Sequence, residues 1–365
     1  MVDMDERTVY GRFTGNVFVS LAEENPEENL VFSPLSILVL LSMAAQAAGG
    51  ETRDEIVEAI TGGCPGYKEL VDKAAGLQRF LAASGDPTSA NAVLVRREIS
   101  GVIRTRYKQD LRKVFAAPLI KSDDLVTDGN AWIKQATDGM IPEIMNDSTK
   151  DVLLCMINAI IFQARWQEEY EEEDIRTGSF RNADGTNAKP QMLQSVEDSY
   201  FEDEYYTGFA KPYSGRFCFV GLLPKRKDRR FFEKALERLD FAALTGNCTY
   251  DPVHVTMPEF ACEYGGDLAG LCKELGMQEM FSDDADFSTM STGRLKISQI
   301  IHKARIEVNR NGTKAAAATM AGFMTGCLPG ELEKPKKVVL NRPFVYAVVD
   351  KETGLPIFVG TVQQL

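Results

Sequence analysis

The sequence predicts an α+β fold. Helical patterns dominate the first part of the chain, and strand patterns dominate the later part. The two kinds of pattern do not alternate steadily, as they would in a doubly wound sheet. Two apolar runs near the C-terminus, joined by a turn that contains glycine, predict a hairpin and add to the strand-rich half.

A short strand and three helices are predicted at the start of the chain. Residues 6–22 carry apolar side chains near helical spacing and indicate an amphipathic helix. Asn29–Phe32 is a short apolar strand, and Ser33, followed by proline, is a typical helix cap. The next helix, Leu35–Ala48, is apolar on nearly every side, so it should be buried centrally. Another helix starts at Thr52.

Strands predominate in the remainder of the chain. Residues 90–96 and 152–163 indicate strands, and the second is apolar on both faces, as in a central strand. Between them, Gly129–Met145 contains a helix that ends near Asp138-Gly139. The other predicted elements are helices at 231–240 and 265–275, strands at 179–193, 198–210, 216–223, 252–262 and 294–301, and the hairpin strands Phe344–Asp350 and Pro356–Val362.

Composition and charge are those of an ordinary soluble globular protein. The 365 residues are 44% hydrophobic and 26% charged, with a formal net charge of −12. This acidic balance argues against a general nucleic-acid-binding surface. The longest apolar run, Ile37–Ala48, is too short to span a bilayer. Because no repeat or long linker interrupts the chain, we expect a single domain over residues 1–365, without nucleic acid or membrane among its partners.

Several kinds of chemistry have no matching motif. The cysteines are odd in number and include no C-x-x-C pair, so no disulfide framework is implied. The two histidines, His254 and His302, have no metal-ligand spacing, so we expect no metal and no cofactor. No G-x-S-x-G, H-E-x-x-H or P-loop motif is present, which argues against an enzyme. The N-terminal residues 1–7 are charged and do not form a signal peptide, which leaves the compartment open.

An alanine-rich segment, Asn309–Leu328, is compatible with more than one conformation. It holds four consecutive alanines and no charge after Lys314. Alanine is the best helix former, yet a strand would sort these side chains into two faces. One face would be uncharged and almost entirely small, with Thr313, Ala315, Ala317, Thr319, Ala321, Phe323 and Thr325. The segment is therefore compatible with insertion into a sheet, with Lys314 on the opposite, solvent-facing side.

A series of short segments, in order along nearly the whole chain, resembles the serpin family. The N-terminal part combines an Asn-Leu-Val-Phe-Ser-Pro-Leu-Ser stretch with an apolar helix and an Ala-Gly-Gly-Glu-Thr end. Any one of these motifs is weak, but many in the family's order are specific. The segments are Asn29–Ser36, Ala48–Thr52, Asn130–Trp132, Thr137–Gly139, Asn158–Phe162, Leu223-Pro224, Met257–Phe260, Leu275–Met277, Ala285–Phe287, His302–Ala304, Glu307-Val308, Gly312-Thr313, Arg342–Phe344 and Phe358–Gly360.

The resemblance implies a fold and a mechanism. The expected fold has helices packed on three β-sheets, and its large central sheet would accept a reactive-centre loop, about residues 309–338 here, as an extra strand. The chain would be a metastable monomer that inhibits serine proteases as a suicide substrate. The protease attacks the loop, forms an acyl-enzyme and is trapped when the loop inserts. The family role favours the extracellular space, with the cytoplasm as an alternative because the chain shows no signal peptide.

The resemblance also assigns the parts of the loop. The hinge would be Gly312, Thr313, Ala315, Ala316, Ala317 and Ala318, and counting from Gly312 places the cleaved bond at Gly326–Cys327. Arg310 and Asn311 depart from the acidic residues usual before the hinge. The segment up to Arg342 is longer than usual, so Met324, Thr325 and Leu328 are neighbouring candidates for the specificity residue.

None of the candidate specificity residues is basic, which makes a trypsin-like target a poor match. Elastase-like proteases fit best, followed by subtilisin-like and chymotrypsin-like ones, with papain-like cysteine proteases as an alternative. A non-inhibitory serpin, acting as a carrier or chaperone, is the other alternative. Such a protein would be expected to hold charged or bulky residues on the inward face of the hinge, which this chain lacks.

Five further residues match positions with roles in the family. Ser33, Ser36, Asn158 and His302 match the cluster at the centre of the large sheet, where its strands part. Buried polar groups there need hydrogen-bond partners whether the sheet is closed or expanded. Trp166 matches the tryptophan at the top of the sheet, where the loop enters. A helix cap, a hydrogen-bonded core histidine and core packing are the alternative accounts of these residues.

Overall fold

The computed structural model describes residues 4–24, 26–64, 66–150, 152–239, 249, 251–313 and 336–365. Backbone contacts divide the chain into two compact units. The first comprises Met1–Glu24, Val31–Phe162 and Glu263–Arg305, and the second comprises Asn25–Leu30, Gln163–Cys262 and Ile306–Leu365. The single domain expected from the sequence stays a prediction. Within the described ranges, no helix is long and apolar enough to cross a membrane.

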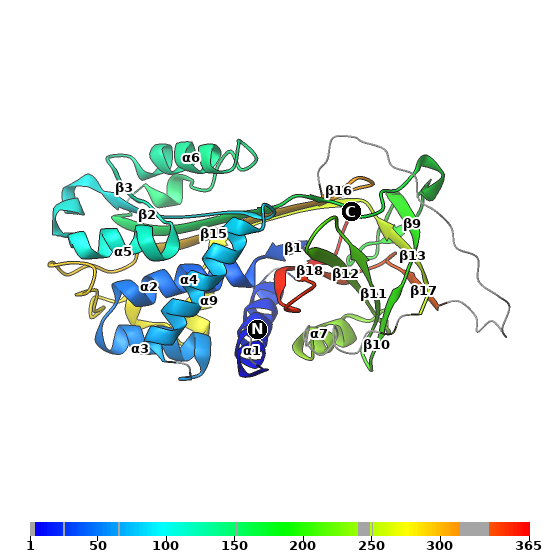
Figure 1. Ribbon diagram of the computed structural model, residues 1–365, viewed down its shortest axis with the longest axis horizontal. Coiled ribbons are helices and arrows are strands. Elements are labelled where there is room, and N and C mark those ends of the chain that lie inside the picture. Colours follow the sequence, from blue (N-terminus) through cyan, green and yellow to red (C-terminus); the bar gives the residue numbers. More distant parts are fainter. Residues whose placement is uncertain are drawn as a thin grey trace. The chain divides into compact units, whose positions relative to one another are not determined.

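Helices are concentrated in the first unit (Figure 1). The described helices are α1 Met4–Glu24, α2 Pro34–Ala47, α3 Gly50–Thr61, α4 Tyr67–Ala83, α5 Thr105–Phe115, α6 Leu125–Ala136, α7 Arg229–Glu237 and α9 Ala269–Glu274. Short 3₁₀ turns occur at η1 Arg97–Val102, η2 Asp147–Thr149, η3 Glu172–Asp174 and η4 Glu279–Phe281.

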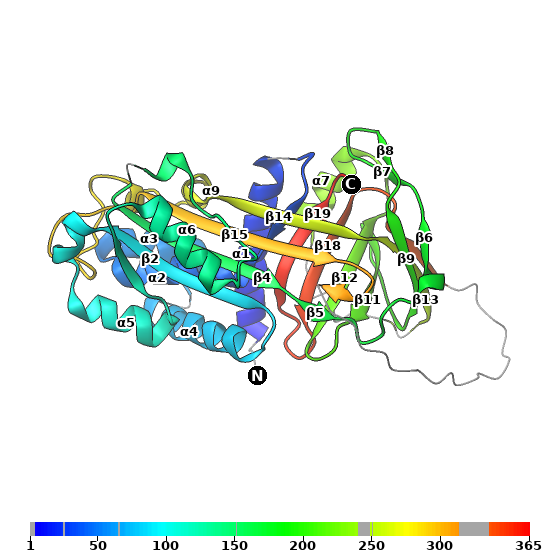
Figure 2. The same cartoon turned by 90° about the horizontal axis from the view of Figure 1, so that it is seen from above.

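The largest sheet of the first unit has five strands in the order β14-β15-β4-β2-β3 (Figure 2). Helix α6 covers one face of this sheet, and α2 lies on the other side (Figure 1). The core under α6 contains Leu125 of that helix together with apolar side chains of three strands. The five strands are β14 Phe260–Asp267, β15 Gln299–Val308, β4 Leu154–Phe162, β2 Thr88–Arg96 and β3 Leu119–Ser122.

The second unit is built mainly on two further sheets. The six-stranded sheet has the order β1-β19-β18-β12-β11-β10, with β1 Leu30–Phe32, β19 Pro356–Val362, β18 Phe344–Asp350, β12 Phe217–Pro224, β11 Tyr206–Pro212 and β10 Ser199–Glu202. The four-stranded sheet has the order β17-β13-β9-β6, with β17 Lys336–Val339, β13 Val253–Pro258, β9 Gln191–Glu197 and β6 Ile175–Thr177. Two small pairs join β16 Gly312–Thr313 to β5 Ala164–Arg165, and β7 Phe180–Arg181 to β8 Asn187–Ala188.

The strongest apolar patterns are confirmed. Every residue of α2 is buried, as expected of a helix that is apolar all round. Every residue of β4 is buried as well, which fits the predicted central strand. The hairpin strands β18 and β19 have the predicted bounds. Helix α6 ends at Ala136, two residues before Asp138 and Gly139, both of which have positive φ.

Several predicted boundaries are wrong. The predicted strands 179–193 and 252–262 each cover more than one strand, and three other boundaries differ for a local polar reason. The predicted strand 198–210 is two strands, because the Asp203 carboxylate accepts two backbone N–H groups and stabilises a turn. The predicted helix 265–275 begins at Ala269, and Asp267 at the end of β14 accepts a hydrogen bond from its N–H. The predicted strand 294–301 begins only at Gln299, while the Ile297 N–H donates to the Met280 carbonyl of η4 instead of to a neighbouring strand.

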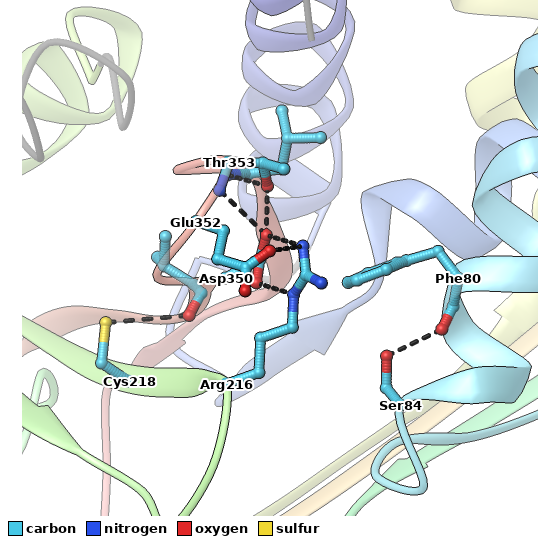
Figure 3. A network of polar contacts seen from close by, with 9 residues as sticks. Phe80, Ser84, Arg216, Cys218, Asp350, Glu352 and Thr353 are labelled. Atoms are coloured by element: carbon cyan, nitrogen blue, oxygen red, sulfur yellow. Dashed lines mark hydrogen bonds and ion pairs between the residues drawn. The ribbon is translucent and has the colours of Figure 1, made fainter. Parts of the chain in front are cut away.

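A polar network stabilises the turn of the C-terminal hairpin (Figure 3). Asp350 at the end of β18 has a completely buried side chain that accepts hydrogen bonds from Arg216 and from the backbone and hydroxyl of Thr353. Burial opposes the charge of this carboxylate, but the hydrogen bonds from Arg216 and Thr353 outweigh it and lower the pKa of Asp350. Gly354 closes the turn with φ +73° and an N–H bond to the Asp350 carbonyl.

Candidate functional site at the centre of the large sheet

The four residues predicted to form a sheet-opening cluster lie together in the first unit. Ser33 immediately precedes α2, Ser36 lies in its first turn, Asn158 is in the middle of β4 and His302 is on β15. All four are completely buried. Because β4 and β15 are neighbours in the sheet, their polar side chains can pair across the boundary between the two strands.

A chain of hydrogen bonds connects the Asn158 and His302 side chains to each other and to the backbone of Ser33. The Asn158 amide oxygen lies 2.8 Å from His302 Nδ1, and the Asn158 amide nitrogen donates to Asn91 Oδ1 at 2.8 Å. Asn91 donates in turn to Gln78 Oε1 at 2.9 Å. At the other end, the Ser33 backbone N–H donates to His302 Nε2 at 3.3 Å. The chain therefore links α2, β15, β4, β2 and α4.

The partners define the proton position on His302. Asn158 Oδ1 can only accept, so Nδ1 carries the hydrogen, and Nε2 must accept from the Ser33 N–H. Burial lowers the pKa of His302 to about 3. Protonation of Nε2 would also place a second ring hydrogen against the Ser33 N–H, so two donors would face each other. The imidazole is therefore neutral and acts as a fixed hydrogen-bonding group.

Ser33 and Ser36 differ in how their hydroxyls are used. Ser33 is the N-cap of α2, and its Oγ accepts from the Ser36 backbone N–H at 3.3 Å. The cap interpretation from the sequence thus accounts for the Ser33 hydroxyl. The Ser36 hydroxyl is buried and has no hydrogen-bond partner among the described atoms. An unpaired buried polar group is unusual and needs an explanation.

Asn91 and Gln78 belong to this network and were missed by the sequence analysis. Asn91 lies directly opposite Asn158 in the antiparallel β2–β4 register. The available signal was a single amide residue within an otherwise small or apolar strand, Ala90–Val95. Gln78 carries no comparable signal, because one glutamine in an amphipathic helix is ordinary.

Trp166 lies in the second unit and is almost fully buried. Its ring stacks on Tyr213, with centroids 4.3 Å apart, and its indole N–H donates to the Asn309 carbonyl at 2.8 Å. The Trp166 backbone N–H donates to the Asn311 carbonyl at 3.2 Å. The tryptophan therefore contacts the start of the predicted loop by both its side chain and its backbone.

Gly312, the first predicted hinge residue, pairs with Arg165 in the β16–β5 ladder. Its φ is +126°, a region that residues with a Cβ rarely adopt. A Cβ at this position would lie 2.3 Å from the Ala164 carbonyl oxygen and 2.7 Å from the Trp166 backbone nitrogen. Glycine is therefore required here by both conformation and space.

Residues 314–335 of the predicted loop lie outside the described residues, whereas residues 336–338 at its end belong to strand β17. The backbone of Thr313 is described in β16, but its side chain is not. The remaining predicted hinge and reactive-bond residues stay predictions: Ala315, Ala316, Ala317, Ala318, Met324, Thr325, Gly326, Cys327 and Leu328.

Comparison with known proteins identifies the class of protein that this fold represents. A family model described as Serpin (serine protease inhibitor) matches residues 8–365. An uncharacterized serpin-like protein of Thermococcus kodakarensis is 29% identical, covering 95% of this chain and 83% of its own length. Plasminogen activator inhibitor 1 of Bos taurus is 28% identical, covering 96% of this chain and 90% of its own length.

The structural comparison agrees. The crystal structure of Tengpin, a thermophilic serpin in the native state, has a TM-score of 0.87 and 29% identity, and it covers 100% of this chain and 95% of Tengpin. The chain belongs to the serpin family, and the predicted serpin fold, with its helices and large sheet, is confirmed. Serpins are protease inhibitors rather than proteases.

Proposed function

We propose that this serpin inhibits serine proteases as a suicide substrate, with Gly326–Cys327 as the reactive bond and residues 309–338 as the loop. The protease would form an acyl-enzyme at this bond and be trapped when the loop enters the large sheet. It would act as a single-domain, metastable monomer in the extracellular space. Its partner would be a serine protease bound covalently.

The observation that carries this proposal is the arrangement of β15 and β4. They are neighbours in the sheet and run in the same direction (Figure 2). A strand that folds back after β15 and enters between them would be antiparallel to both. One parallel pairing would thus be replaced by two antiparallel pairings, which are slightly more stable per residue. The extra ladder of hydrogen bonds supplies the driving force for insertion.

The sequence of the loop supports the same proposal. The inward face, from Thr313 to Thr325, carries no charge, so insertion would bury no unpaired ion. At about 3.3 Å per residue, the strand Thr313–Gly326 would extend about 46 Å and carry an attached protease across the length of a domain. The His302–Asn158 pair lies at the boundary that would open, which fits a gating role.

The absence of a basic residue near Gly326 favours elastase-like targets, followed by subtilisin-like and chymotrypsin-like ones. The test is to mix the protein with elastase, subtilisin and chymotrypsin and to look for a covalent complex of summed mass that survives SDS. The mass of the released C-terminal fragment identifies its first residue, which we expect to be Cys327. A fragment that starts outside residues 325–329 would refute the assigned bond.

A matched pair of variants tests the insertion step. Thr313→Arg places a charge on the inward face and should convert the inhibitor into a substrate that is cleaved without complex formation. Lys314→Glu changes a charge on the outward face and should leave complex formation unchanged. Full inhibition by Thr313→Arg would rule out insertion in this register.

A further inference from the structure

A buried ion pair beside Trp166 has no part in the sites described above. Lys211 on β11 and Glu197 on β9 lie with Nζ and Oε1 2.9 Å apart, and their side chains are only 4% and 8% exposed. β11 belongs to the six-stranded sheet and β9 to the four-stranded sheet of the second unit, so the pair joins the two sheets. Removing both charges from water is unfavourable unless further partners compensate them.

The Glu197 carboxylate has a second partner. Oε1 accepts from the Ser195 hydroxyl at 2.6 Å, and that hydroxyl lies 3.3 Å from the Tyr170 hydroxyl. Burial raises the pKa of Glu197, the direction expected where a carboxylate loses water and its ion pair compensates only in part. Tyr170 is thus tied to the pair through Ser195.

The Lys211 ammonium is covered by two aromatic rings. Its Nζ lies 4.5 Å from the ring centroid of Tyr170 and 5.5 Å from that of Trp166. Both distances are within the range in which a cation is attracted to a ring face. The two rings meet edge to face, with centroids 6.4 Å apart, so they form two walls around one ammonium group.

The same two aromatic residues contact the turn that leads into the hinge. The Trp166 indole N–H bonds to the Asn309 carbonyl, the Tyr170 N–H bonds to the Arg310 carbonyl at 3.1 Å, and the Trp166 N–H bonds to the Asn311 carbonyl. These are three consecutive carbonyls, and the next residue is Gly312. Trp166 and Tyr170 therefore connect the ion pair to the backbone of the turn, which would have to move first during insertion.

We propose that Lys211 and Glu197 are positioning residues for loop insertion: their ion pair fixes Trp166 and Tyr170, and these two residues hold the turn Asn309–Asn311 until insertion begins. This inference rests on the proposed inhibitory function. The pair determines how readily β16 leaves β5. A pair of apolar side chains would fill the same space, but it would supply neither the ammonium between the rings nor the acceptor for Ser195.

The test uses Lys211→Met, Glu197→Gln and the double variant, all in a Trp132→Phe background, so that Trp166 is the one remaining tryptophan of the chain. Trp166 emission and the exchange of the Trp166 and Tyr170 backbone amides are measured on the free protein. We expect exchange at both amides to be on the order of tenfold faster in all three variants, because their carbonyl partners are held less firmly. Lys211→Met should show the largest change, since it leaves a buried carboxylate unpaired.

The double variant separates positioning from stability. With both charges removed, its urea midpoint should return toward that of the parent protein, while its amide exchange stays fast and its Trp166 emission stays shifted. If the double variant shows parental exchange at both amides and parental emission, the ion pair does not position these residues and the proposal is wrong.

An exposed ion pair of the same length provides the control. Lys225 and Glu202 lie in the same unit, also 2.9 Å apart, with side chains 34% and 46% exposed. Lys225→Met with Glu202→Gln should change neither readout, because exposed pairs contribute little. Equal effects from both pairs would show that the loss of any ion pair, not its position beside the two rings, is responsible.

The consequence for inhibition is measured separately. The variants should lose the ability to form covalent complexes during incubation on the order of tenfold faster than the parent, because the hinge is released earlier. An unchanged half-life alongside fast exchange would overturn the link to insertion. If the parent protein forms no complex with any protease, the proposed function fails, while the exchange and emission results still decide whether the ion pair positions the turn.

Discussion

Between pH 8 and pH 5, acid should destabilise this protein through the buried side chain of His302. The ring is completely buried, is held between Asn158 and the Ser33 N–H, and has a pKa lowered by burial to about 3. In the unfolded chain a histidine titrates near 6.5. The unfolded state therefore binds a proton that the folded state excludes, throughout the range between these two values.

The sign and size of the effect follow from linkage. Because the folded pKa is the lower one, stability is fully present above about pH 6.5 and is lost as the pH falls toward 3. At about 1.4 kcal/mol per pH unit, the loss relative to pH 8 should be about 2 kcal/mol at pH 5. His302→Gln removes the titrating group, so this part of the pH dependence should disappear.

The assay is the urea midpoint of unfolding at pH 5, 6, 7 and 8 for the parent protein and the variant. The second histidine of the chain offers a matched control: His254 is exposed on β13, so His254→Gln should keep the parental pH dependence. The quantity compared is the slope of the urea midpoint against pH. A loss of stability in His302→Gln that is the same at every pH therefore does not affect the comparison. Parallel slopes for the parent and His302→Gln would refute the reasoning.

Three further predictions concern stability, each read from thermal or urea unfolding. Gly312→Ala should destabilise by about 2 kcal/mol or more, because its Cβ meets backbone atoms at a strained φ; Gly215→Ala, at φ +105° with open space around it, should cost less, and equal losses would discount the backbone clash. Asp350→Asn should lose about 2 kcal/mol by weakening the pairing with Arg216 at the hairpin turn, and an unchanged midpoint would contradict the structural role of that network. Ser36→Ala should stabilise the described state by about 1 kcal/mol, since it removes an unpaired buried hydroxyl; a loss instead would mean that the hydroxyl is paired.

The elements predicted well from the sequence are those whose apolar pattern is compatible with only one environment, the buried core. A helix that is apolar all round, α2, and a strand that is apolar on both faces, β4, can only be buried. The boundaries that failed depend on single polar side chains, such as Asp203 and Asp267, which stabilise a turn or a helix start. Whether such a carboxylate accepts backbone N–H groups depends on local conformation, which propensity does not determine.

The residues of the candidate site also differ in whether the sequence could predict them. Ser33, Asn158 and His302 were found from the family resemblance, and the structure brings them into one hydrogen-bonded chain. Asn91 and Gln78 complete that chain, yet they belong to segments distant in sequence, and only the register of β2 against β4 brings Asn91 opposite Asn158. Register and helix packing decide which polar residues meet, and neither can be read from a single strand.

The distribution of paired and unpaired polar groups bears on how a closed sheet could later open. In the cluster, the Asn158 amide has partners on both neighbouring strands, whereas the Ser36 hydroxyl nearby has none among the described atoms. A paired group resists separation of β4 from β15, and an unpaired buried one stores about 1–3 kcal/mol that a new partner would release. Under the proposed mechanism, the first sets the barrier to opening and the second adds to the driving force. Mutations of Asn158 and Ser36 should therefore act on different quantities, the rate of insertion and the free energy of the closed state.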